Sequence, residues 1–259
     1  MPGLEPPPCP FIWEGGVDGG RLQVRMGEET ETLVHASAMA EFLSQQRLVG
    51  AGRMAILCAM AAVRQTWEYS QRHGRCDGER IADHLADSCR TWLSNFPHLM
   101  ALRTMSSALR DCAEDHLHRL SGGELAARLI MEGRRLMNQW WQQLLAMHAH
   151  LPRLQPLRAC QDGLLDPLLA EAATEATAEA RILLPCSACS QATAQLSPQV
   201  LTAMASEAPK RLILVVEPGQ VAPGPLSHAL PQGVAFLSPS GISHNGPSCE
   251  GEAWQGSLL

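Results

Sequence analysis

The sequence predicts an α/β protein in which a β-hairpin and a helical domain come first and a smaller α/β domain follows. Three observations predict this order. Two short β-type runs flank paired glycines in residues 11–24, a helical pattern extends from about 36 to 150, and apolar runs then alternate with helix-like segments. With 259 residues, 46% of them hydrophobic, the chain can bury a substantial core.

The first domain is expected over residues 11–150, after a flexible, proline-rich amino terminus at 1–10. FIWEGGVDGGRLQV (11–24) predicts a hairpin because the glycines permit a tight turn. Pro97 separates two helices, and Ser121 with Glu124 forms a capping box before a long third helix. Apolar residues at spacings of three and four line one face of each of the first two helices: Ile81, Leu85, Cys89 and Trp92, then Leu102, Met105, Leu109 and Cys112.

The second domain is expected over residues 164–240, after a proline-punctuated linker at 151–163 and before an irregular tail at 241–259. Alternation of strands and helices predicts a small parallel sheet of two or three strands. The expected strands are Arg181–Leu184, Arg211–Val216 and Val234–Leu237, with helices at about 164–179 and 191–207. We expect Leu212–Val216 to be an exposed edge that invites pairing with another chain.

Composition excludes several classes of function. The formal net charge of −6 provides no basic field for nucleic acid. The longest mostly apolar run, Met54–Val63, is too short to span a membrane, and the amino terminus has no secretory pattern, so a cytoplasmic protein is expected. Nine scattered cysteines suit reduced thiols.

Cys186 and Cys189 follow the expected strand Arg181–Leu184, and the carboxyl end of such a strand is where α/β sheets bind ligands. Cys186 is therefore a catalytic residue, half of a CxxC pair or a small buried side chain. A second cysteine pair and suitably spaced histidines are lacking, so we expect no metal site.

The order of five segments resembles the family of methylthioribose-1-phosphate isomerases, ribose-1,5-bisphosphate isomerases and regulatory subunits of translation initiation factor 2B. The segments extend over about 230 residues and are FIWEGG…GRLQV, LVGAGRMA (48–55), NFPHLMAL (95–102), ARILLPCSACSQATAQL and KRLILVVEPGQVAPG. The resemblance implies a hairpin and helical domain followed by a Rossmann-like α/β domain, which is truncated here.

The resemblance also implies aldose–ketose isomerisation of a phosphorylated sugar without a cofactor, with a cysteine and an aspartate moving protons. Cys186 matches the catalytic cysteine. The substrate-binding positions carried over are Gly50, Ala51, Arg53, Ser187, Glu217 and Gly224, Arg53 being a substitute for an arginine four positions earlier.

The chain departs from this pattern where charge is needed. Val49 and Phe96 stand where the family has phosphate-binding arginines, and Ala101 replaces an asparagine. No aspartate occurs after Asp166, so the proton-transferring acid of the later segment is missing. A pocket without these donors binds a sugar phosphate poorly.

Three hypotheses follow. The favoured one is a non-catalytic or weakly active isomerase relative that acts as a binding, structural or regulatory subunit. The alternatives are an active sugar-phosphate isomerase that uses Cys186, and a sugar-phosphate or nucleotide sensor without turnover. The expected partners are a phosphorylated sugar ligand and other subunits, either in a homo-oligomer or in a hetero-oligomer with an intact family member.

Overall fold

The computed structural model describes residues 7–16, 20–45, 48–74, 76–97, 99–159, 165–173, 181–185, 212–215, 218 and 235–243. The chain divides into two compact units. The first comprises Met1–Leu48, Ala55–Phe96 and Met105–Trp141, and the second comprises Val49–Met54, Pro97–Thr104 and Gln142–Leu259. Among the described helices, none is long and apolar enough to cross a membrane.

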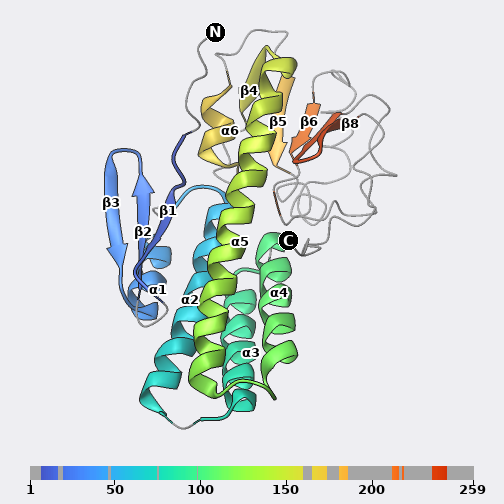
Figure 1. Cartoon of the computed structure of the whole chain (residues 1–259). Coiled ribbons are helices and arrows are strands. Elements are labelled where there is room, and N and C mark those ends of the chain that lie inside the picture. Colours follow the sequence, from blue (N-terminus) through green and yellow to red (C-terminus); the bar gives the residue numbers. More distant parts are fainter. Residues whose placement is uncertain are drawn as a thin grey trace. The chain divides into compact units, whose positions relative to one another are not determined.

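The first unit begins with a three-stranded antiparallel sheet of order β1-β2-β3 (Figure 1). Its strands are β1 (Phe11–Glu14), β2 (Arg21–Met26) and β3 (Glu29–Leu33). The predicted hairpin is confirmed, with Trp13 opposite Leu22. Sequence reasoning missed β3 because its residues, ETETL, are mostly polar, and it follows a tight turn at Gly27, whose φ is +62°.

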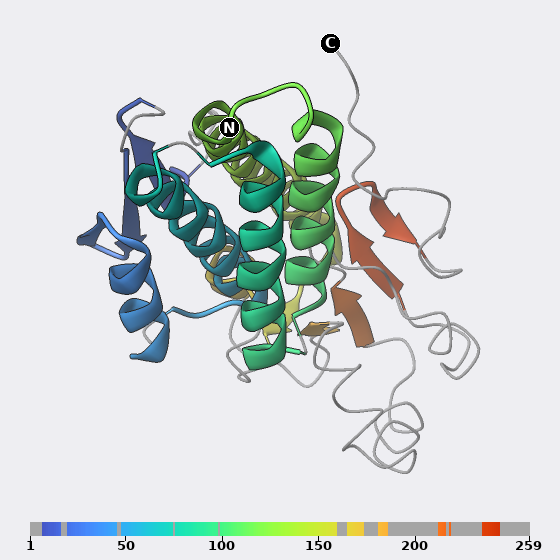
Figure 2. The ribbon, with the colours of Figure 1, turned by 90° about the horizontal axis from the view of Figure 1, so that it is seen from below.

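The predicted helical segment from about 36 to 150 is confirmed. It contains α1 (Ala36–Ser44), α2 (Ala51–Arg72), α3 (Gly78–Asn95), α4 (Met100–His116) and α5 (Gly122–His150), and a short 3-10 helix, η1 (Leu151–Leu154), follows. The division into units falls within α2, α4 and α5. Pro97 lies between α3 and α4, which run side by side (Figures 1 and 2).

Two side-chain caps fix helix starts in the first unit. Asp77 accepts a hydrogen bond from the Arg80 N–H at 2.9 Å and so caps α3. The predicted capping box precedes α5: the Glu124 carboxylate accepts from the Ser121 N–H at 2.9 Å, and the Ser121 hydroxyl accepts from the Glu124 N–H at 3.4 Å. Each of these contacts satisfies an amide that has no acceptor within its own helix.

The core of the first unit forms where the apolar helix faces meet the inner face of the sheet. Trp140 of α5 is fully buried, and its ring lies 6.2 Å from that of Phe11 in β1. The predicted apolar stripes of α3 and α4 are buried, except that Trp92 is half-buried. Trp92 therefore lies at the edge of the core, within reach of the surface.

The second unit contains a five-stranded sheet of order β4-β5-β6-β7-β8. Its strands are β4 (Leu157–Ala159), β5 (Arg181–Pro185), β6 (Leu212–Val215), β7 (Ala235–Ser238) and β8 (Gly241–Ser243). The strands from β4 to β7 pair in parallel, and β8 pairs antiparallel with β7. The predicted parallel sheet is confirmed, with more strands than expected.

Three expectations for this unit need correction. Leu212–Val216 is not an edge, because β6 pairs with β5 on one side and β7 on the other. Strands β4 and β8, of three residues each, occupy parts of the ranges expected to be linker and tail. Helix α6 (Pro167–Glu171) begins after the expected start at 164, because Asp166 caps it and Pro167 is its first residue, and it ends at Glu171 rather than near 179. The expected helix at 191–207 lies outside the described residues.

Candidate functional site

The carboxyl ends of β5 and β6 lie next to each other in the sheet of the second unit. Pro185, the last residue of β5, is paired in register with Val215, the last residue of β6. In the sequence, Cys186 and Ser187 follow the first of these strand ends, and Glu217 and Gly224 follow the second. These four site residues lie outside the described residues, as does Cys189.

The start of α2 provides the other part of the predicted site, and it belongs to the same unit as the sheet. The Gly50 carbonyl accepts the Met54 N–H at 3.1 Å, which is the first hydrogen bond of the helix. Gly50 has φ +101°, and a Cβ there would lie 3.2 Å from the Cα of Asp166. A glycine is therefore needed at Gly50, and Ala51 behind it is buried.

Arg53 forms a two-pronged ion pair with Asp166, 113 residues further along the chain. Its Nε donates to Oδ2 at 2.8 Å, and its Nη2 donates to Oδ1 at 3.0 Å. The Asp166 side chain is fully buried, that of Arg53 is 14% exposed, and Oδ1 also accepts the Leu168 N–H at 2.9 Å to cap α6. This bidentate ion pair links the start of α2 to the start of α6.

Uncharged side chains stand at the positions where the resemblance places charged or polar groups. Val49 is 46% exposed. Ala101 is buried. In the first unit, the Phe96 ring stacks on Trp92 with centroids 6.2 Å apart. None of these three side chains can donate a hydrogen bond to a phosphate.

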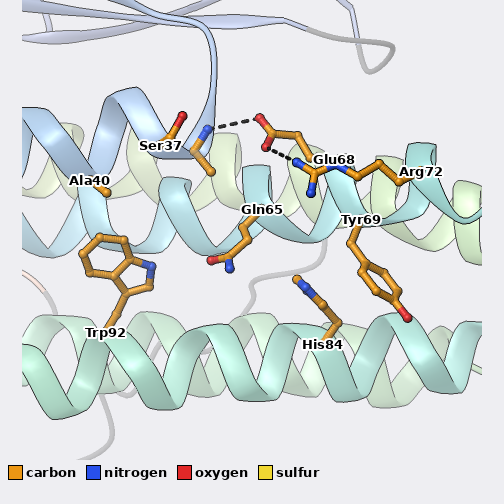
Figure 3. Close-up of a pocket in the computed structure, with 9 residues that line it drawn as sticks. Ser37, Ala40, Gln65, Glu68, Tyr69, Arg72, His84 and Trp92 are labelled. Atoms are coloured by element: carbon orange, nitrogen blue, oxygen red, sulfur yellow. Dashed lines mark hydrogen bonds and ion pairs between the residues drawn. The ribbon is translucent and has the colours of Figure 1, made fainter.

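A second site, which sequence reasoning did not foresee, is a pocket of about 310 Å³ in the first unit between α1, α2 and α3 (Figure 3). Gln65 of α2 points toward α3 between the rings of Trp92 and His84 (Figure 3). The lining residues are Ala36, Ser37, Ala40, Gln65, Glu68, Tyr69, Arg72, His84 and Trp92.

Glu68 organises the polar side of this pocket. Its Oε1 accepts the Ala36 N–H and the Arg64 Nε–H, each at 3.1 Å, so the carboxylate covers the start of α1. The Arg64 side chain is 4% exposed and also donates to the Gly20 carbonyl at 2.8 Å. Arg72 lies 3.6 Å from Oε2 with a side chain that is 73% exposed. The Glu68 carboxylate therefore contacts two guanidinium groups, of which that of Arg64 is buried and that of Arg72 faces solvent.

The aromatic side of the pocket is built on Tyr69, the single tyrosine of the chain. Its ring stacks with those of His73 and His84, with centroids 4.2 Å away in each case. Burial lowers the pKa of the His84 imidazole below its ordinary value of 6.5; the charge of Asp87 opposes this, and the charges of His73 and Arg72 add to it. His84 is therefore a neutral ring at physiological pH.

Sequence reasoning missed Asp166, for which a local signal existed, and the pocket, which depends on contacts between distant residues. The pattern Asp166-Pro167 is a helix-start signal that was available from the sequence. The spacing of Arg64 and Glu68 was also visible, but their contacts with the hairpin turn and with α1 are not local. Among the described residues there is no cluster of three or more His, Cys, Asp or Glu side chains placed to hold a metal ion.

The fold defines a class: an antiparallel sheet and helical unit combined with a parallel α/β sheet. No family model matches the sequence, and no curated protein matches it by sequence. The structure is similar to that of 5-methylthioribose 1-phosphate isomerase from Pyrococcus horikoshii OT3, with a TM-score of 0.51 at 11% identity, over 91% of this chain and 92% of that one.

Two further structures have lower scores. Translation initiation factor eIF-2B subunit delta from A. fulgidus gives a TM-score of 0.44 at 13% identity, over 80% of this chain and 67% of that one. The tetrameric eIF2B-beta2-delta2 complex from C. thermophilum gives 0.43 at 11% identity, over 81% and 91%. The isomerase likeness confirms the predicted resemblance at the level of fold: the chain shares the fold of 5-methylthioribose 1-phosphate isomerase.

Proposed function

We propose that the protein is a non-catalytic or weakly active relative of the sugar-phosphate aldose–ketose isomerases that acts as a binding, structural or regulatory subunit. The observation that supports this most directly is the ion pair of Arg53. The one cation that the resemblance offers for a phosphate is held by a fully buried carboxylate within the same unit.

A sugar phosphate needs fixed donors that replace its hydration. Two N–H groups of Arg53 already donate to Asp166, and the carboxylate cancels the charge that would attract a dianion. A phosphate that competed for Arg53 would weaken the ion pair of the fully buried Asp166 carboxylate, which is costly. The uncharged Val49 and Ala101 add no compensating donor.

The proposed site for a residual ligand combines the start of α2 with the two strand ends. Gly50, Ala51 and Arg53 would meet the ligand from the helix, and Ser187, Glu217 and Gly224 would meet it from the sheet. Cys186 would be the catalytic residue if activity survives. The α/β domain that contains β4 to β8 is proposed to be Rossmann-like, and the protein is proposed to be cytoplasmic and to assemble with an intact relative.

The test uses the full chain with methylthioribose 1-phosphate and ribose 1,5-bisphosphate, and measures turnover together with thermal stabilisation. Cys186→Ser is compared with Cys9→Ser as a thiol control. Absence of turnover and of stabilisation agrees with a subunit that works through protein contacts. Turnover that Cys186→Ser abolishes and Cys9→Ser preserves would overturn the proposal in favour of an active isomerase. Stabilisation without turnover would favour the sensor.

A further inference from the structure

The pocket between α1, α2 and α3 has a chemistry of its own and lies in a different compact unit from the proposed sugar-phosphate site. From its lining, we infer that it binds a small planar aromatic carboxylate of one or two fused rings. This inference does not rest on the proposed function.

The walls of the pocket favour a flat aromatic ring. Trp92 and His84, both on α3, lie on either side of Gln65 (Figure 3), and Tyr69 stacks on His84. Aromatic rings gain by offset stacking or edge-to-face contact in addition to burying apolar area. Because His84 is neutral, it presents a ring face without a net charge. The volume of about 310 Å³ is at the small end of ligand pockets, which suits a ligand of one or two rings.

The charges of the pocket favour one negative charge on that ligand. Glu68 carries one negative charge and is shared by Arg64 and Arg72, so these three groups sum to one positive charge. Arg64 is enclosed and also occupied by the Gly20 carbonyl. Arg72 faces solvent, 3.6 Å from Glu68, and its guanidinium is the cation that a ligand can reach.

A carboxylate fits this arrangement better than a phosphate. A planar carboxylate matches the fork of a single guanidinium. A dianionic phosphate would exceed the single positive charge and would be repelled by the Glu68 carboxylate beside it. The Gln65 amide and the Ser37 hydroxyl add neutral hydrogen-bonding groups to the lining, which suit ring heteroatoms or hydroxyl substituents.

The test is calorimetric titration of the full chain with four probes that separate these features. Indole-3-acetate has both ring and carboxylate, indole-3-ethanol lacks the charge, cyclohexylacetate lacks the aromatic ring, and phenyl phosphate has a dianionic group. We expect indole-3-acetate to bind most tightly, and each of the other three probes to bind about tenfold more weakly or not at all.

Variants locate the binding. Arg72→Gln and Trp92→Leu should each weaken indole-3-acetate about tenfold, whereas Arg90→Gln, an exposed arginine that does not line the pocket, should leave it unchanged. Circular dichroism spectra identical to that of the unaltered chain show that a variant is folded. The inference is overturned if indole-3-acetate shows no saturable binding, if folded Arg72→Gln binds it equally well, or if phenyl phosphate binds more tightly.

Discussion

The ion pair between Arg53 and Asp166 gives an asymmetric prediction for stability. Removing the arginine as Arg53→Met takes the guanidinium away from a fully buried carboxylate. Removing the acid as Asp166→Asn leaves a guanidinium that is 14% exposed and can turn toward water, and the asparagine oxygen can still accept the Leu168 N–H that caps α6.

The expected magnitudes follow from this difference in burial. Arg53→Met should cost about 3–5 kcal/mol, the range for a broken buried ion pair. Asp166→Asn should cost less, about 1–3 kcal/mol, because the remaining charge is partly hydrated and the helix cap persists. In the double variant no buried charge is left, so its cost should fall below the sum of the two by about 1–3 kcal/mol.

The assay is urea unfolding of the full chain and the three variants, followed by circular dichroism and by tryptophan fluorescence. Agreement between the two signals establishes that one free energy of unfolding describes the transition. Additive costs, with a coupling energy below about 0.5 kcal/mol, would refute the ion pair as described. A larger cost for Asp166→Asn than for Arg53→Met would refute the argument from burial.

Two further outcomes are expected. Gly50→Ala should lower the free energy of unfolding by about 1–3 kcal/mol, because φ is +101° and the new Cβ would lie 3.2 Å from Asp166 Cα. Gly74→Ala is the control, because a Cβ there meets nothing within 4 Å. Equal melting temperatures for the two variants would contradict this expectation. Burial lowers the pKa of His84, so its neutral form favours the folded state above pH 6.5 and this contribution is lost as the pH falls below that value. His84→Gln should therefore lessen the drop in melting temperature on acidification, which His118→Gln, at an exposed histidine, should leave unchanged.

Local sequence patterns were sufficient to predict most of the helices and several of the strands. The spacing of Ile81 and Leu85 on one helix face, the capping box at Ser121 and the apolar run of β5 each act within a few residues, and each appears where it was predicted. The polar strand β3 and the three-residue strand β8 were missed, because pairing with a neighbouring strand defines them rather than any pattern of their own.

The candidate sites likewise depend partly on local sequence and partly on tertiary contacts. Residue patterns alone predicted the order of a hairpin, a helical segment and a parallel sheet, and the resemblance marked Gly50 and Arg53 as candidate substrate-binding residues. Tertiary structure decided that Arg53 pairs with Asp166, and that Trp92 lines a pocket. Periodicity reports which side of an element is buried, whereas the partner of a charged or aromatic side chain depends on elements far apart in sequence that the chain brings together only when it folds.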